Sequence, residues 1–234
     1  HRLRGNDVLM VSGSDTHGTP ITISADQLGI SPAEVVERFH ASFLESWVGL
    51  GISFDLFTHT NTRNHFDVTT DFFLRLLDKG YVYKETMQQM WCERDARFLP
   101  DRYVEGTCPI CGYVGARGDQ CDNCGNQLDA LDLIEPRCKL CGETPFPRET
   151  EHFFLDLARL NEPLKTWISA QEHWRNHVRA FSLGLLNEGL RGRAITRDID
   201  WGVPVPVEGY EHKRIYVWFD AVIGYLSASI EWAR

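Results

Sequence analysis

The sequence lacks several features that would assign it to a common class. It has no run of about 18 apolar residues, so no membrane-spanning helix is expected. It has no repeat at domain scale and no low-complexity tract, which excludes solenoid and tract-driven architectures. The start of the chain shows no charged-then-apolar secretory pattern, and it begins with His1 instead of Met, as a fragment of a longer chain would.

An excess of positive charge is also missing. The chain carries 24 Lys and Arg against 33 Asp and Glu, giving a net charge of -9. A protein that simply coats DNA or RNA needs cations to neutralise phosphates. The balance therefore excludes that role, although an enzyme that touches RNA through one local basic patch remains compatible with it.

What is present suits an α/β protein. The 234 residues are 43% hydrophobic, enough for one large domain or for a domain with an insertion. Residues 7–14 (DVLMVSGS) show no polar alternation, which predicts a parallel strand buried on both faces. The polar segment 14–20 (SDTHGTP) then follows the carboxyl end of that strand, where doubly wound sheets bind ligands.

Capping and periodicity predict the other elements. Ser31, Pro32 and Glu34 form a capping-box pattern that starts a helix running to about residue 47. Apolar spacing predicts further helices at about 63–78, 160–170, 173–187 and 220–231, and strands at 81–84, 151–157 and 215–219.

Residues 87–148 differ in character, because Gly, Cys, Asp and Pro dominate and regular periodicity disappears. A segment of this length without its own hydrophobic core needs another source of stability. Three pairs supply it: Cys108 with Cys111, Cys121 with Cys124, and Cys138 with Cys141. Each pair is Cys-x-x-Cys-Gly, a spacing that presents two sulfurs to one zinc ion, and the Gly can adopt positive φ. Disulfides or buried free thiols are the alternative, but no secretory signal favours them.

The seventh cysteine, Cys92, lies three residues before Asp95. Asp95 stands where a second cysteine of a fourth pair would be, and a carboxylate oxygen is an acceptable zinc ligand. One reading is a second site made by Cys92, Asp95, Cys138 and Cys141. The other is that Asp95 is a solvated carboxylate and Cys92 a small buried residue. A closed four-sulfur site leaves no position for a reactive water, so the first zinc would be structural.

Motifs across nearly the whole chain resemble the methionyl-tRNA synthetase family. They occur in the family's order at 13–21 (GSDTHGTPI), 98–109 (FLPDRYVEGTCP), 151–154 (EHFF) and 216–225 (YVWFDAVIGY). The resemblance implies a Rossmann-like parallel sheet interrupted by a zinc-binding connective-peptide insertion. Its division would be 1–80 as catalytic domain, 81–212 as insertion with zinc knuckles at 87–148, and 213–234 as catalytic domain again. It also implies nested zinc sites, Cys108, Cys111, Cys121 and Cys124 in one, and Cys92, Asp95, Cys138 and Cys141 in the other.

The resemblance further implies a cytoplasmic methionine-tRNA ligase. Such an enzyme uses ATP and Mg²⁺ to form methionyl-adenylate and then transfers methionine to tRNA(Met). Asp15 is similar to the aspartate that binds the methionine ammonium group, and Arg197 to the arginine that couples to it during activation. Trp218, Ala221 and Tyr225 resemble the walls of the side-chain pocket, with Val222 where some members have Pro. His17 is expected to be a turn or core histidine.

Two family motifs are not in the sequence, His-Ile-Gly-His and Lys-Met-Ser-Lys-Ser. We therefore expect these 234 residues alone not to activate methionine. Two other hypotheses are open. A zinc-ribbon interaction module would explain the cysteines, but not the Asp15 and Trp218 segments. A synthetase for valine, leucine or isoleucine would carry a larger insertion.

Overall fold

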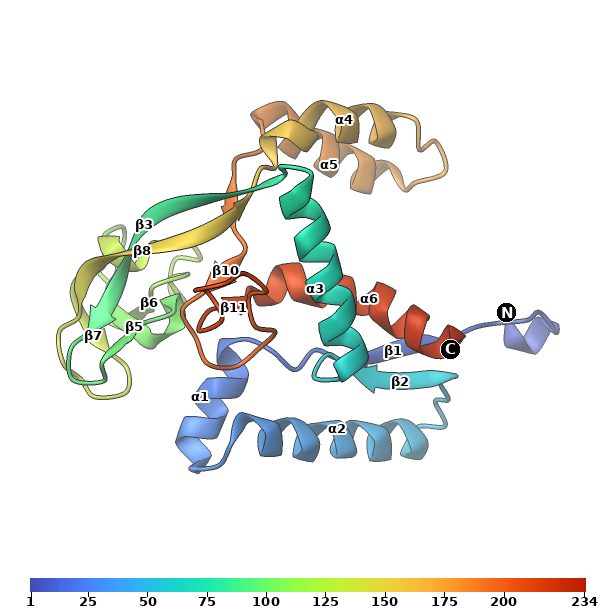
Figure 1. The fold of residues 1–234 in the computed structure, drawn as a ribbon, viewed down its shortest axis with the longest axis horizontal. Coiled ribbons are helices and arrows are strands. Elements are labelled where there is room, and N and C mark those ends of the chain that lie inside the picture. The colour runs from blue at the N-terminus through green and yellow to red at the C-terminus, as the bar shows by residue number, and fades with distance from the viewer.

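The computed structural model describes residues 1–234, and its centre is a small parallel sheet flanked by helices (Figure 1). Strand β1 (Val11–Ser14) pairs in parallel with β2 (Leu56–His59), Val11 opposite Leu56. The single turn η1 (Arg2–Arg4) precedes them. The predicted strand at 7–14 is confirmed only for its second half. The prediction that this strand is buried on both faces was wrong, because β2 is its only partner and Leu9 and Met10 are exposed.

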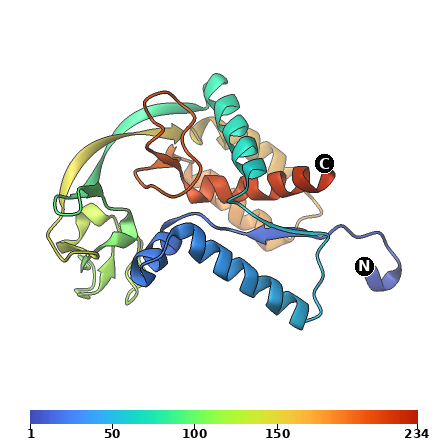
Figure 2. The ribbon, with the colours of Figure 1, turned by 60° about the horizontal axis from the view of Figure 1, so that its bottom comes forward.

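Four helices surround this sheet, α1 (Thr19–Leu28), α2 (Pro32–Gly49), α3 (Arg63–Asp78) and α6 (Val217–Ala233) (Figure 2). The capping box at α2 is confirmed: the Glu34 N–H donates to Ser31 Oγ at 3.2 Å, and the Ser31 N–H donates to the Glu34 carboxylate at 2.8 Å. The Thr62 hydroxyl caps α3 in the same way, by accepting from the His65 N–H at 3.1 Å. Helix α1 was not foreseen. No helix is long and apolar enough to cross a membrane.

A long antiparallel ribbon leads away from the helices (Figure 1). Strand β3 (Val82–Cys92) pairs with β8 (Phe146–Leu155) from Val82 opposite Leu155 to Trp91 opposite Phe146. Short strands β4 (Arg97–Phe98) and β9 (Arg193–Ala194) flank it in the order β4-β3-β8-β9. The loss of periodicity at 87–148 did not indicate how far this ribbon extends, since backbone pairing continues to Trp91 in β3 and begins at Phe146 in β8.

The far end of the ribbon holds the cysteine-rich segment. It contains β5 (Val104–Thr107), β6 (Ala116–Arg117) and β7 (Ile134–Cys138), with turns η2 (Asp101–Tyr103) and η3 (Ala130–Asp132). Its core is small. Leu99, Tyr103 and Val104 are fully buried among four of the cysteines. The prediction that this segment lacks its own hydrophobic core was wrong, because 11 buried residues between 90 and 138 form one cluster and only four of them are cysteines.

After β8 the chain forms η4 (Ala158–Leu160) and a hairpin of two helices, α4 (Asn161–Ser169) and α5 (Asn176–Glu188), both of which were predicted. It returns through β10 (Thr196–Arg197), which pairs antiparallel with β11 (Arg214–Ile215). The strand predicted at 215–219 was wrong. The N–H groups of Phe219 and Asp220 donate to the carbonyl of Tyr216 at 2.9 and 3.0 Å, so the chain turns into α6 at that point.

Candidate functional site

Asp15 lies at the carboxyl end of β1, in a loop that two threonines hold against the end of β2. The Thr16 N–H donates to Thr60 Oγ1 at 3.0 Å, and the two hydroxyls lie 2.8 Å apart. The Asp15 side chain remains exposed to the cleft. Partial burial raises its pKa, with a smaller contribution from the charge of Asp220. The loop therefore presents a single anionic group at a strand end.

A cavity of about 380 Å³ joins Asp15 to the exposed face of α6. Trp218, Ala221, Val222 and Tyr225 line it, at helical spacings of three, four and seven residues that place them on one face. Trp218 is 71% exposed and Tyr225 78% exposed, so neither ring is a core residue. The expected meeting of Asp15 with Trp218, Ala221 and Tyr225 is thus present. Both aromatic residues come from one helix, and not from a strand followed by a helix.

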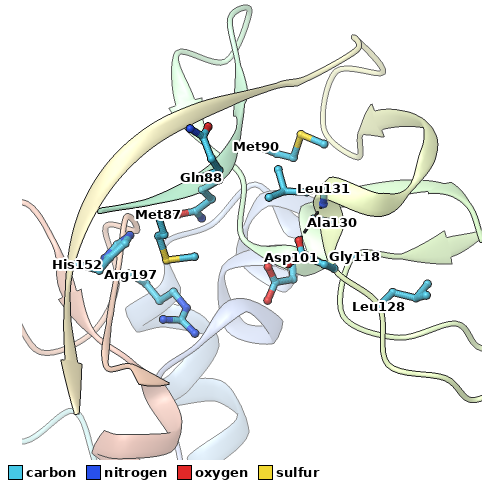
Figure 3. A pocket seen from close by; sticks show the side chains of 12 residues that line it. Met87, Gln88, Met90, Asp101, Gly118, Leu128, Ala130, Leu131, His152 and Arg197 are labelled. Atoms are coloured by element: carbon cyan, nitrogen blue, oxygen red, sulfur yellow. Dashed lines mark hydrogen bonds between the residues drawn. The ribbon is translucent and has the colours of Figure 1, made fainter. Parts of the chain in front are cut away.

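A second cavity, of about 350 Å³, is lined by Asp15, Trp218 and Arg197. The Arg197 guanidinium donates to the carbonyls of Thr196 at 2.8 Å and Ala194 at 3.1 Å, and it lies 3.8 Å from the centre of the Tyr216 ring. Burial lowers its pKa from the usual arginine value. Figure 3 shows Arg197 and Asp101 on two sides of a further cavity beneath the ribbon.

A buried ion pair fixes the strand that carries Arg197. Lys213, only 4% exposed, donates to the adjoining Asp198 and to Thr150 Oγ1 at 2.8 Å. The Thr150 hydroxyl donates to the second Asp198 oxygen at 2.7 Å. Burial opposes ionisation of Asp198, but hydrogen bonds from His152, Lys213 and Thr150 outweigh it and hold its pKa far below the usual range. Sequence reasoning missed this network, because nothing in the spacing links 150, 198 and 213.

A second buried network lies behind Asp15. His17 Nδ1 lies 2.5 Å from one oxygen of Asp220, and His65 Nε2 lies 2.5 Å from the other. All three side chains are buried. The expectation of a core histidine at 17 agrees with this position, but the roles of His65 and Asp220 were missed. One signal was available: Asp220 is the only charged residue in the apolar segment 215–226.

Four cysteines converge at the first candidate metal site, Cys108, Cys111, Cys121 and Cys124. The sulfurs of Cys108 and Cys124 are 3.9 Å apart, and those of Cys111 and Cys121 are 3.6 Å apart. A tetrahedral zinc with Zn–S bonds of about 2.3 Å requires sulfurs about 3.8 Å apart, so the set fits that ion. Gly112 and Gly125 adopt φ of 75° and 72°, as predicted for the turns.

The second candidate site gathers Cys92, Asp95, Cys138 and Cys141. The sulfurs of Cys92 and Cys141 are 3.4 Å apart, and an Asp95 oxygen lies 3.0 Å from the Cys138 sulfur. Asp95 therefore faces the thiols, and the reading of a solvated surface carboxylate was wrong. No cysteine forms a disulfide. Three sulfurs and one oxygen are a donor set that zinc accepts.

Comparison with known proteins identifies the family to which the chain belongs. The family described as "tRNA synthetases class I (M)" matches residues 1–234. The methionine-tRNA ligase of Thermomicrobium roseum is 60% identical over 233 residues, covering 100% of this chain and 40% of the relative. That of Dehalococcoides mccartyi (strain CBDB1) is 61% identical over 233 residues, covering 100% of this chain and 42% of the relative.

Among solved structures, the Mycobacterium tuberculosis methionyl-tRNA synthetase bound by methionyl-adenylate superposes with a TM-score of 0.70 at 23% identity. It covers 97% of this chain and 40% of that protein, and at this identity it supports the fold alone. The chain spans about 40% of the length of the curated relatives that it matches. With the family match over all its residues, the chain belongs to the class I tRNA synthetases of the methionine type.

Proposed function

We propose that this chain supplies the amino-acid cleft and the metal-stabilised insertion of a cytoplasmic methionine-tRNA ligase. The observation that carries the proposal is the cavity shared by Asp15 and the aromatic face of α6. It joins one anionic group to two exposed aromatic rings, which suits an ammonium group attached to an apolar side chain. We propose that residues 1–80 and 213–234 form the catalytic part and that residues 81–212 form the insertion.

Methionine offers three recognisable parts. Its ammonium group would pair with Asp15, the one carboxylate that faces the cavity of about 380 Å³. Its thioether offers little to hydrogen bonds, so selection must rest on shape and on sulfur–aromatic contact with Trp218 and Tyr225. Ala221, between them on the helix, leaves room for the side chain.

Its carboxylate would react. In the activation step a carboxylate oxygen of methionine would attack the α-phosphate of ATP, pyrophosphate would leave, and methionyl-adenylate would form; Mg²⁺ would supply charge neutralisation for the phosphates. The amino acid then passes to a ribose hydroxyl of tRNA(Met), and AMP leaves. Arg197 borders the adjoining cavity of about 350 Å³ and would act with Asp15 during activation. Groups that hold the triphosphate would come from outside these residues.

Zinc would act on structure only. With Cys108, Cys111, Cys121 and Cys124 as ligands it would have no open position for a reacting water. The ligands of both sites lie between the end of β3 and the start of β8, so bound metal would hold these loops together and stabilise the insertion. Free thiols of this kind are maintained in a reducing compartment such as the cytoplasm.

Amino-acid-dependent pyrophosphate exchange by the complete protein tests the proposal. We expect exchange with methionine and not with valine or leucine, and loss of exchange when Asp15 is replaced by Ala. A complete protein that exchanges with leucine but not methionine would contradict the proposal. So would a protein with two bound zinc ions and no exchange with any amino acid, because a zinc-folded interaction module would then explain the chain.

A further inference from the structure

The buried group formed by His17, His65 and Asp220 connects three parts of the chain that are distant in sequence. His17 belongs to the loop after β1, His65 to the first turns of α3 and Asp220 to the first turn of α6. Asp220 is fully buried, and each of its oxygens receives one imidazole at 2.5 Å. The Ser227 hydroxyl, also on α6, contacts the other His65 nitrogen, Nδ1, at 2.7 Å.

The hydrogen bonds define where the protons lie. A carboxylate only accepts, so His17 donates from Nδ1 and His65 donates from Nε2. The Nδ1 atom of His17 therefore carries the proton of this hydrogen bond, and the negative charge stays on Asp220. Burial opposes that charge, but the two imidazoles outweigh burial and lower the pKa of Asp220.

The two ends of this group lie next to the two walls of the cleft. Asp15 precedes His17 by two residues, and Trp218 precedes Asp220 by two residues. The backbones also approach closely: a Cβ on Gly18 would lie 3.2 Å from a Val217 methyl. The indole N–H of Trp201 donates to the Thr16 carbonyl at 2.7 Å, which holds the same loop from another side.

We propose that His17, with its hydrogen bond to Asp220, is a positioning residue that sets the distance between the Asp15 carboxylate and the Trp218 wall. His65 holds Asp220 from the opposite side, so α6 cannot slide away from the loop. The inference rests on the proposed function, because it assigns a purpose to the distance between two substrate contacts. His65 and Asp220 line neither cavity, and His17 borders only the cavity of about 350 Å³.

The same three side chains also have the donor types of a metal site. Each ring nitrogen lies only 2.5 Å from a carboxylate oxygen, however, whereas two nitrogen or oxygen ligands of one tetrahedral zinc lie about 3.4 Å apart. The group is therefore a hydrogen-bonded link and not a third zinc site.

The experiment compares matched replacements in the complete protein. The amide nitrogen of Asn can occupy the place of histidine Nδ1, so H17N keeps the donor to Asp220, whereas H17L removes it. At the other oxygen, H65Q keeps a donor in the place of Nε2 and H65L removes it. We expect H17L and H65L to raise the KM for methionine about tenfold or more while the KM for ATP stays within twofold. H17N and H65Q should stay near the parent protein.

A purely structural role predicts a different result. The variant S31A removes the cap of α2, away from the cleft, and should lower the melting temperature without changing the KM for methionine. If H17L lowers the melting temperature as S31A does and leaves the KM for methionine unchanged, the positioning role is wrong. Equal loss in H17N and H17L would also overturn it, as would a third zinc ion per chain that H17L releases.

The positioning role can be judged apart from the proposed function. Crystal structures of the parent, H17N and H17L proteins measure the separation of the Asp15 carboxylate and the Trp218 ring with no substrate present. An increased separation in H17L alone supports the positioning role, even if the parent shows no exchange with methionine. An unchanged separation in H17L rejects it, even if the exchange assay succeeds.

Discussion

Asp15 and Arg197 border one cavity, yet no ion pair joins their side chains. The Nη1 group of Arg197 donates to two backbone carbonyls, and the guanidinium stacks on Tyr216. The Asp15 carboxylate consequently remains available for a cation that arrives from outside. On the proposed function, the ammonium group of an amino acid would supply that cation, and its carboxylate would then lie nearer the arginine.

Neutralising Asp15 should weaken binding of methionine specifically. In D15N the shape is kept and the charge is lost, so an ammonium group meets a partly buried amide. We expect the KM for methionine to rise about 100-fold, the scale for truncating one partner of a charge pair in a binding site. Steady-state pyrophosphate exchange measures this. A rise in the KM for ATP of equal size would show that the cleft had collapsed instead.

Acid should weaken methionine binding earlier than an ordinary aspartate would allow. The pKa of Asp15 is raised, chiefly by burial, so the carboxylate begins to protonate above the usual aspartate range. The ammonium group needs the ionised form, and the KM should therefore rise about tenfold per pH unit once the pH falls below that pKa. Exchange measured at decreasing pH checks this, with D15N as the control whose KM should not change with pH.

Removing Lys213 should destabilise the chain near Arg197. K213M leaves the buried Asp198 carboxylate without its cation, a change that typically costs about 3–5 kcal/mol. We expect a lower melting temperature together with a lower kcat for exchange, because Asp198 adjoins Arg197. The double variant K213M/D198N removes the uncompensated charge and should recover part of the melting temperature. No difference between the single and double variants would contradict this account.

Two zinc ions per chain are expected, with unequal lability. Asp95 contributes an oxygen where the other site has sulfur, and a thiolate suits zinc better in a closed site. D95A should hold one zinc ion, and D95C two, with slower loss to a chelator than in the parent. Elemental analysis and timed chelation measure both. Retention of two ions by D95A would remove Asp95 from the set of ligands.

Gly18 should tolerate no side chain. Its φ of 101° is strained for any L-residue, and a Cβ would press on Val217 at 3.2 Å. G18A should cost about 1–3 kcal/mol of folding stability and should raise the KM for methionine by separating the loop from α6. The double variant G18A/V217A should restore part of the KM and little of the stability, since it relieves the contact but not the backbone strain. Denaturant unfolding and exchange measure the two effects.

The sequence predicted best what local chemistry decides. The Ser31 cap, the helix at 63–78 and the cysteine turns all appear where spacing placed them, because each depends on neighbouring residues. The start of α6 was misjudged, since Val217 to Phe219 is as apolar as a strand. The Tyr216 N–H still bonds to the Ile195 carbonyl of the neighbouring segment, and the helix begins directly afterwards, where the Phe219 and Asp220 N–H groups donate to the Tyr216 carbonyl.

The same contrast between local and long-range features holds for the candidate site. The motif resemblance identified Asp15 and Trp218, which line one cavity, and spacing identified the cysteine pairs, which converge at separate sites. His65, Asp220 and Lys213 were not predicted, because their partners are distant in the chain. His65 and Asp220 are 155 residues apart, and Lys213 and Asp198 are 15 residues apart. Their roles depend on which segments fold against each other, and no local pattern carries that information.

The ribbon of β3 and β8 limits how this chain can vary. Side chains alternate between its faces, so inserting or deleting one residue within a strand would turn every later side chain to the other face. Thr150 and His152, which approach Asp198 from one face, would then point away from it. Length changes in relatives should therefore gather at the tips between the cysteine pairs, where the metal ligands fix the ends of a loop but not its length.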